Sequence, residues 1–156
     1  MRFGLFHTAL LSIGLFVQTT AGANGGDLPW SNCMVDTANR YGVSSRLVAA
    51  IIAAESGNNP KAIHVNRHPD GSHSEDLGLM QVNSWWLPRI EALGYDRDSL
   101  FEPCVNIEVG VWILAQEVQH YGYTWTAVGA YNAGRAPDRQ LRRARYARRV
   151  FEHLEP

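Results

Sequence analysis

Residues 46–57, RLVAAIIAAESG, form an almost uncharged run that ends in a carboxylate. Alanine, leucine and isoleucine in this density favour a helix, and we predict one over Arg46–Ser56. Ser44 or Ser45 is suited to cap its N-terminus. Gly57 is suited to end it.

One face of this helix is apolar except for its last member. The residues that share the face by i, i+3, i+4, i+7 spacing are Val48, Ile51, Ile52 and Glu55. Burial disfavours the ionised form of a carboxyl group, and so does the negative end of the helix dipole. Both effects should raise the pKa of Glu55. A carboxylic acid that stays protonated near neutral pH can act as a general acid at a glycosidic oxygen. The alternative is a glutamate that simply emerges into water at a helix end.

Further elements follow from hydrophobic spacing and from turn residues. Additional helices are expected over residues 32–41, 88–93, 106–121, 124–131 and 139–153. The strongest is 106–121, where Ile107, Val111, Leu114, Val118 and Tyr121 form one stripe. Residues 58–76 read as a loop with a short hairpin around Asp70-Gly71. No repeat or long linker divides the chain.

Length and composition indicate one domain. The chain has 156 residues, of which 46% are hydrophobic and 19% are charged, and a single core is usual at this size. A net charge of −1 gives no general reason to expect nucleic acid as a partner. The basic residues are concentrated at the C-terminus, where residues 135–156 hold seven Arg against three acids. That segment is either a solvated helix face or a surface that attracts an anionic polymer or membrane.

The charged side chains of the last helix are expected to point outward. Arg139, Arg142, Arg143 and Arg149 take that position if Ala147, Val150, Phe151 and Leu154 face the core.

Residues 1–23 have the pattern of a secretory signal peptide. Arg2 precedes an apolar run from Phe3 to Val17, and the small residues Ala21-Gly22-Ala23 follow. The run is shorter than the roughly 17–25 residues that span a bilayer. We expect cleavage after Ala23, a mature domain over residues 24–156, a periplasmic location and no stable membrane anchor.

Export to an oxidising compartment would favour a disulfide between the two cysteines. Cys33 and Cys104 are the only pair, so one intramolecular disulfide is possible, and an oxidising compartment favours it. It would tie the first helix to the start of the longest one. Two buried free thiols are the alternative.

Four motifs occur in a fixed order along the chain. They are Glu55-Ser56-Gly57-x-x-Pro60, Gly78-Leu79-Met80-Gln81-Val82-Asn83, Ala130-Tyr131-Asn132-Ala133-Gly134 and Tyr146-Ala147. In order and spacing the chain resembles the family 1 lytic transglycosylases over residues 33–151. This resemblance implies a mostly helical α+β, lysozyme-like fold with a hairpin near residues 63–82 beside a cleft. The short length and paired cysteines resemble small members that accompany secretion, conjugation or pilus machines.

The resemblance also implies roles for particular residues. Glu55 matches the catalytic acid and base, and Ser56 matches the serine near the acetamido groups of the substrate. The loop of Gly78, Leu79, Met80 and Gln81 matches the loop along the sugar cleft. The matches beside the glutamate are Tyr131, Asn132 and Tyr146. On the residues alone, Met80 and Tyr131 could equally be core side chains.

The implied reaction cleaves the β-1,4 bond between N-acetylmuramic acid and N-acetylglucosamine in peptidoglycan glycan strands and forms a 1,6-anhydro ring, with no cofactor and no metal. Glu75 and Asp76 keep open a lysozyme-like hydrolase, which needs a second carboxylate. A peptidoglycan-binding assembly factor without catalysis is a further alternative, although the intact Glu55 argues against it. A metal site from His64, His68 and His73 is the weakest reading.

Overall fold

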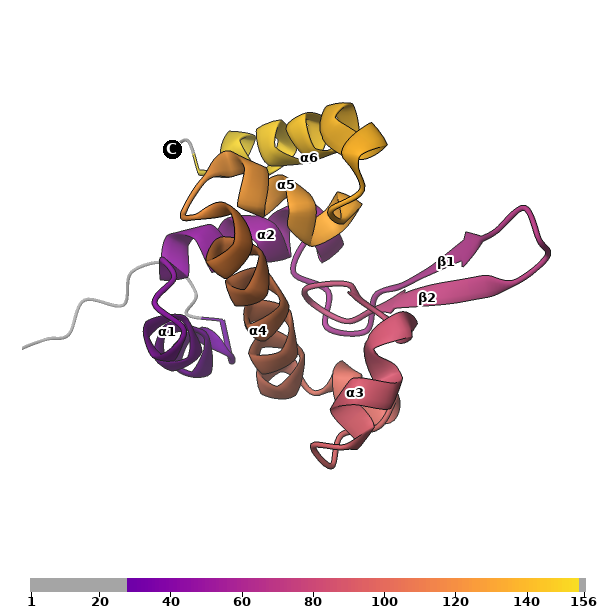
Figure 1. The fold of residues 1–156 in the computed structure, drawn as a ribbon. Coiled ribbons are helices and arrows are strands. Elements are labelled where there is room, and N and C mark those ends of the chain that lie inside the picture. The colour runs from indigo at the N-terminus through magenta and orange to yellow at the C-terminus, as the bar shows by residue number, and fades with distance from the viewer. Residues whose placement is uncertain (1–27, 155–156) are drawn as a thin grey trace, which may run out of the picture.

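The longest helix runs through the middle of the molecule, and the other elements pack around it (Figure 1). The computed structural model describes residues 28–154, so the predicted signal peptide over residues 1–23 lies outside the described part. The helices are α1 (Ser31–Arg40), α2 (Ser45–Ser56), α3 (Leu87–Glu91), α4 (Pro103–Tyr121), α5 (Trp125–Ala133) and α6 (Gln140–Glu152). Short 3-10 turns occupy Ser84–Trp86, Asp98–Phe101 and Pro137–Arg139. The strands are β1 (Ile63–Arg67), β2 (His73–Leu77) and β3 (Val82–Asn83).

Helix α4 separates two hydrophobic clusters. On one side Ile107, Val111 and Leu114 pack in a cluster that includes residues of α1, α2, α5 and α6. On the other side Val109 and Ile113 pack with residues of the sheet and of α3. The single stripe expected from the sequence is therefore incomplete, because α4 is buried on two sides. A helix buried in this way can fix the two halves of the molecule relative to each other.

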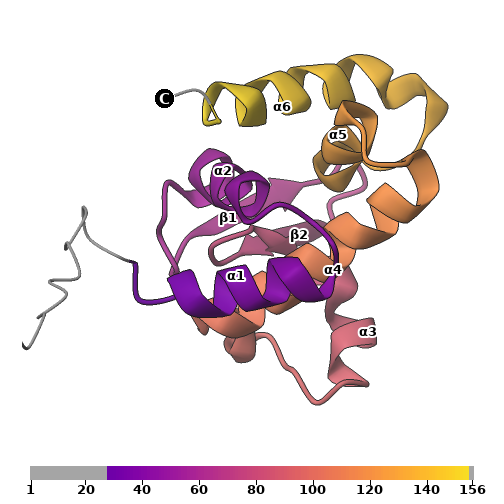
Figure 2. The ribbon, with the colours of Figure 1, turned by 90° about the vertical axis from the view of Figure 1, so that its left-hand side faces the viewer.

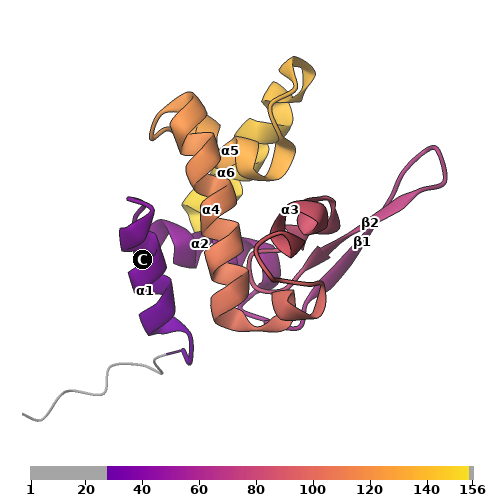
Figure 3. The ribbon, with the colours of Figure 1, turned by 60° about the horizontal axis from the view of Figure 1, so that its bottom comes forward.

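The small sheet is antiparallel, in the order β1-β2-β3. Ile63 pairs with Leu77 and Arg67 pairs with His73, so the turn at Asp70-Gly71 closes a regular hairpin, as predicted. The hairpin extends away from the helices (Figure 3), and only its base reaches the core, through the fully buried Leu77. The sheet is thus anchored at one end, beside the C-terminus of α2.

Cys33 and Cys104 form the predicted disulfide, which joins α1 to the first turn of α4. Figure 2 shows α1 lying along α4. A second tie lies along the same contact, where the carboxylate of Glu108 accepts hydrogen bonds from Thr37, Arg40 and Tyr41. The shortest of these, from Arg40, is 2.7 Å. The first helix is therefore held both covalently and electrostatically.

The ends of α2 and α5 follow the capping signals with two differences. Ser44 is the N-cap residue of α2, but its side chain makes no cap hydrogen bond. Gly57 ends α2 in the left-handed conformation, with φ of 59°. Thr124 caps α5 as predicted, since its hydroxyl accepts from the backbone N–H of Ala127 at 3.3 Å. Helix α5 continues to Ala133, beyond the expected end at 131, so that Asn132 is helical.

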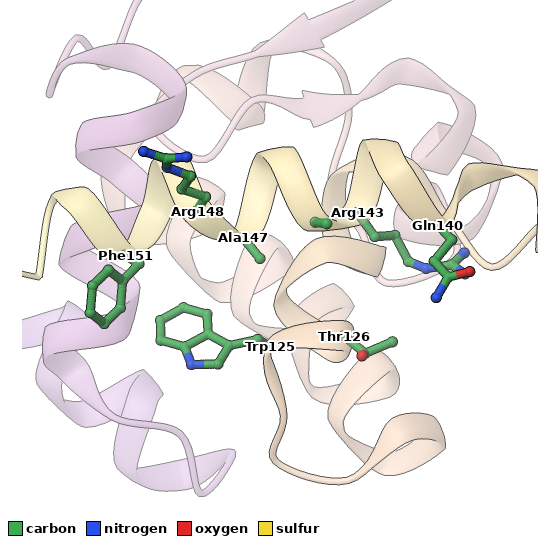
Figure 4. Close-up of a pocket in the computed structure, with 8 residues that line it drawn as sticks. Trp125, Thr126, Gln140, Arg143, Ala147, Arg148 and Phe151 are labelled. Carbon is green, nitrogen blue, oxygen red and sulfur yellow. The ribbon is translucent and has the colours of Figure 1, made fainter.

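Two expectations for α6 are wrong. Ala147 and Val150 are buried as predicted, but Phe151 is 44% exposed and stacks edge-on against Trp125 with ring centroids 5.4 Å apart. Arg143, expected outside, is buried and donates to the backbone carbonyls of Gly134 and Ala136. Figure 4 shows both side chains at a cavity of about 520 Å³ between α5 and α6. Arg143 turns inward because these two carbonyls after α5 give its guanidinium partners.

The described residues form a mostly helical α+β fold with a three-stranded antiparallel sheet, as predicted. No helix within residues 28–154 has the length and apolar character to cross a bilayer.

Candidate active site

A cleft of about 820 Å³ lies between the sheet and the C-terminal helices. Its floor includes Glu55 at the end of α2 and Glu117 on α4. The sheet contributes one wall, and α5 with the start of α6 contributes the other. Trp85 and Trp86 lie at the sheet side of the cleft, with rings 4.8 Å apart. A cleft lined by carboxylates and tryptophan rings fits a sugar polymer as substrate.

Glu55 lies in the cleft but is largely shielded from water. Its side chain is only 9% exposed, as the apolar stripe of α2 predicted. Burial raises the pKa of Glu55 above its ordinary value, and the negative charge of Asp76 raises it further. The protonated form is therefore favoured at a higher pH than for a glutamate in water.

Three neighbours moderate this shift. The Tyr146 hydroxyl, the Arg149 guanidinium and the Asn132 side chain each favour the charged form and lower the pKa of Glu55, but burial outweighs them. The guanidinium of Arg149 lies 4.0 Å from the Glu55 carboxylate. The Tyr146 hydroxyl is buried, and it has no hydrogen-bond partner within the described residues. A carboxyl group held between these opposing influences can both release and take up a proton.

Asp76 is a further carboxylate of the cleft, in addition to Glu55 and Glu117. It lies on β2, and its two oxygens accept hydrogen bonds from Asn66 at 2.7 Å and from Asn83 at 2.6 Å. Glu75, the other sequence-nearby candidate, does not line the cleft. Its carboxylate binds Arg97 at 2.8 Å, and this partner lowers the pKa of Glu75. Of the two neighbouring carboxylates on β2, alternation along the strand thus places Asp76, and not Glu75, on the cleft side.

The Gly78-Leu79-Met80-Gln81 loop supports the cleft from below. Leu79 and Met80 are fully buried in the core. Gln81 lines the cleft, while its side-chain nitrogen donates to the carbonyl of Gly78 at 2.9 Å. Gly78 itself has φ of 72° and lies so close to Asn106 and the Leu100 carbonyl that a Cβ would overlap them. Only glycine fits at this position.

The two predicted site tyrosines lie beside Glu55, with Tyr146 buried and Tyr131 partly buried. Tyr131 on α5 lines the cleft, and its hydroxyl donates to the Met80 carbonyl at 2.6 Å. Tyr146 on α6 is 4% exposed, with its ring 6.4 Å from that of Tyr131. Burial and the nearby carboxylate of Glu55 hold the pKa of both phenols well above the ordinary value. Both hydroxyls therefore stay protonated.

The predicted site residues divide into two groups by position. Glu55, Gln81, Tyr131 and Asn132 line the cleft, and Tyr146 is adjacent to Glu55. Ser56, Gly78, Leu79 and Met80 lie behind the lining. The hydroxyl of Ser56 donates to the carbonyl of Ile52, one turn earlier in α2, at 3.1 Å.

Sequence reasoning missed Asn106, the residue that fixes this loop. Asn106 is fully buried in the first half of α4. Its amide donates to the carbonyls of Leu77 and Leu100 at 2.8 Å each, and its oxygen accepts from the N–H of Met80 at 2.7 Å. An asparagine directly before the apolar stripe of α4 was the available signal.

Sequence reasoning also missed the ion pair between Glu117 and Arg135. Glu117 lines the cleft near the C-terminal end of α4, and its carboxylate accepts a hydrogen bond from Arg135 at 2.9 Å.

His64, His68 and His73 of the hairpin do not form a metal-binding cluster. Within residues 28–154, no three His, Cys, Asp or Glu side chains are placed to hold an ion together. His68 instead lies 3.3 Å from the Ser74 hydroxyl across the hairpin.

Comparison with known proteins agrees with this geometry. The family model for the transglycosylase SLT domain matches residues 32–153, which include both walls of the cleft and Glu55. The chain belongs to the transglycosylase SLT domain family. Several named proteins are similar to this chain in sequence. Invasion protein IagB of Salmonella typhimurium is 42% identical over 125 residues, covering 80% of this chain and 76% of IagB.

Two further relatives are more distant. Protein IpgF of Shigella flexneri is 34% identical, covering 78% of each chain. A putative peptidoglycan-binding-like protein of Escherichia coli K12 is 34% identical, covering 80% of this chain and 81% of that protein.

A solved structure confirms the lysozyme-like fold. An inactive variant of the lytic transglycosylase Slt from Pseudomonas aeruginosa matches 81% of this chain with a TM-score of 0.61 and 24% identity. The match covers 24% of that longer chain. At this identity the likeness establishes the fold.

Proposed function

We propose that this protein is a peptidoglycan lytic transglycosylase in which Glu55 is the catalytic acid and base. The observation that carries the proposal is the buried carboxyl of Glu55, whose pKa is raised by burial, in a cleft shared with Asp76. Membership of the SLT family supports the same enzyme class.

The reaction begins with the protonated Glu55. Its proton passes to the bridging oxygen between N-acetylmuramic acid and N-acetylglucosamine, and the C1–O bond breaks. Positive charge then develops at C1. The 2-acetamido group of the muramoyl residue stabilises that charge, and the Asp76 carboxylate, oriented by Asn66 and Asn83, favours it electrostatically.

Glu55, now ionised, completes the reaction as a base. It takes the proton of the muramoyl 6-hydroxyl, whose oxygen attacks C1 and closes the 1,6-anhydro ring. The proton lost in the first step is regained in the second, and no water is consumed. One carboxyl group can serve both steps because Arg149, Tyr146 and Asn132 stabilise its charged form while burial favours its neutral form.

A lysozyme-like hydrolase is the second candidate, and Asp76 favours it. In a retaining hydrolase the second carboxylate would act as nucleophile or stabiliser, and water would take the place of the 6-hydroxyl. The two outcomes share Glu55 and differ in whether the product contains an added water.

The setting of the activity is also part of the proposal. We infer cleavage of a signal peptide after Ala23 and a mature domain over residues 24–156 in the periplasm. The disulfide is consistent with an oxidising compartment. The relative named invasion protein IagB supports a role in opening the cell wall locally for a secretion apparatus.

The test uses residues 24–156 and purified peptidoglycan sacculi. The parent protein should release soluble fragments, and Glu55→Gln should reduce the rate at least a hundredfold. Glu91→Gln, an exposed carboxylate on α3, is the matched control and should retain the parent rate. Equal rates for parent and Glu55→Gln would exclude the role of Glu55. Binding without release by the parent would favour an assembly factor.

A further inference from the structure

One side of α6 carries a stripe of arginines along the cleft. Arg139, in the turn before α6, and Arg142 both line the cleft. Tyr146 and Arg149 continue the same side at spacings of four and three residues. Arg149 belongs to the catalytic centre, since it lies 4.0 Å from Glu55. Arg139 and Arg142 are farther along the cleft and are not explained by the proposed chemistry.

These two cations have no acidic partner in the protein. Across residues 28–154, Arg142 makes no hydrogen bond and no ion pair, and Arg139 donates only to the carbonyl of Ala133, at 3.0 Å. Arg135, a few residues earlier, differs because its charge is matched by Glu117 at 2.9 Å. Arg139 and Arg142 therefore bring two unmatched positive charges to one wall of the cleft.

The sugar chain of the proposed substrate does not account for them. A polymer of N-acetylated sugars is neutral, and its hydroxyl and amide groups do not require a cation. Negative charge in peptidoglycan lies in the carboxylates of the peptide stems attached to the muramoyl residues. A guanidinium group matches a carboxylate in both charge and geometry.

We propose that Arg139 and Arg142 bind a carboxylate of the peptide stem, so that this enzyme prefers glycan that carries peptides. This inference rests on the proposed function. The stem would leave the sugar chain on the α6 side of the cleft, while the hairpin and the two tryptophans contact the opposite side. The two arginines thus act as specificity determinants and take no part in bond cleavage.

A second carboxylate source has the same chemistry. When the peptide is removed, the lactyl group of the muramoyl residue becomes a free carboxylate. It lies next to the sugar ring, whereas Arg139 and Arg142 are exposed at the edge of the cleft, so the stem is the source that we expect. The experiment separates the two sources.

The experiment measures binding with the Glu55→Gln protein, which prevents turnover during the titration. The ligands are a muropeptide tetrasaccharide with intact stems and the same tetrasaccharide without them. Tryptophan fluorescence gives the dissociation constants, since Trp85 and Trp86 line the cleft. The peptide-bearing ligand should bind about tenfold more tightly, and added salt should reduce this difference.

Variants of the arginines identify the contact. Arg139→Gln with Arg142→Gln should weaken binding of the peptide-bearing ligand about tenfold and bring the two affinities close together. Arg142→Gln alone, which breaks no hydrogen bond within the fold, should show a smaller loss in the same direction. Arg145→Gln, on α6 but outside the cleft, is the matched control. In the Glu55→Gln protein it should leave the affinity for both ligands unchanged.

Each outcome decides between the possibilities. Equal affinity for both ligands, unaffected by the arginine variants, would overturn the inference and leave the proposed function intact. Tighter binding of the peptide-free ligand, lost in the double variant, would assign the arginines to the lactyl carboxylate and overturn the stem proposal. Binding of neither ligand would overturn the proposed function and this inference with it.

Discussion

The hydroxyl of Tyr131 donates a 2.6 Å hydrogen bond to the backbone carbonyl of Met80. This contact joins α5 to the loop beneath the cleft, 51 residues apart in sequence. Burial, with the charge of Glu55, holds the pKa of Tyr131 well above its ordinary value, so the phenol remains a donor. The phenol proton is donated to the Met80 carbonyl, and Tyr131 therefore fixes the α5 wall of the cleft to the loop beneath it.

Removal of this hydroxyl should loosen the site. Tyr131→Phe leaves the Met80 carbonyl without its partner, and we expect a loss of about 1–3 kcal/mol in the free energy of unfolding. Urea unfolding measures the change. Tyr95→Phe is the control, because the Tyr95 hydroxyl makes no hydrogen bond within residues 28–154. Equal stability of the two variants would contradict the role given to Tyr131.

Asn106→Ala should be more damaging. The substitution removes three hydrogen bonds from a fully buried site and frees the loop that Gly78 and Met80 belong to. We expect a loss of about 3 kcal/mol or more in the free energy of unfolding, with reduced activity in the remaining folded protein. Gln119→Ala, exposed on the same helix, should change stability little. A mild effect at Asn106 would show that the loop is held by packing alone.

The neighbours of Glu55 should shift its titration in opposite directions. The charge of Asp76 raises the pKa of Glu55, so Asp76→Asn should lower it. The charge of Arg149 lowers the pKa of Glu55, so Arg149→Gln should raise it. Carbon NMR of the Glu55 carboxyl measures both shifts without requiring activity. Where variants remain active, the basic limb of kcat/KM should move with the same sign. Shifts in one common direction would contradict this account.

The raised pKa also has a consequence for stability. The native state binds a proton at Glu55 more tightly than the unfolded chain does, because burial raises the pKa above its unfolded value. This contribution to stability is complete below the unfolded pKa and is lost as pH rises through the folded pKa. Glu55→Gln should therefore gain stability over the parent protein as pH rises. Thermal unfolding at acidic and neutral pH tests this, and a gain confined to acidic pH would contradict it.

Reduction of the disulfide should lower the melting temperature. Cys33 and Cys104 are separated by 71 positions, and a bridge over such a loop contributes up to about 4 kcal/mol in the chain-entropy model. Glu108 and its three partners should keep α1 near α4 after reduction, so we expect a folded but less stable protein. An unchanged melting temperature would show that the bridge contributes nothing.

The sequence predicted those parts of the fold that depend on local patterns. The apolar run from Arg46 to Ser56, ended by Gly57, specified α2 and placed Glu55 at the edge of the core. The Asp70-Gly71 turn specified the hairpin. Each of these features depends on residues close together in the chain, and so each could be inferred without the tertiary structure.

Features that depend on distant partners were missed. Arg143 was expected outside because the carbonyls that hold it belong to the turn after α5. Asn106 gave little signal because its three partners lie at the end of β2, in the loop after β2 and in the turn before α4. The second buried side of α4 depends on the sheet and α3, which pack against it from distant parts of the chain. The spacing of apolar residues along one helix does not show which distant segment packs against its other face.

Product analysis tests the central claim most directly. Residues 24–156 are incubated with purified peptidoglycan in water enriched in heavy oxygen, beside the Glu55→Gln control, and the released muropeptides are identified by mass spectrometry. The account predicts 1,6-anhydromuramoyl products without heavy oxygen, absent from the control. Products one water heavier, with reducing ends that carry the heavy oxygen, would contradict it and identify a hydrolase.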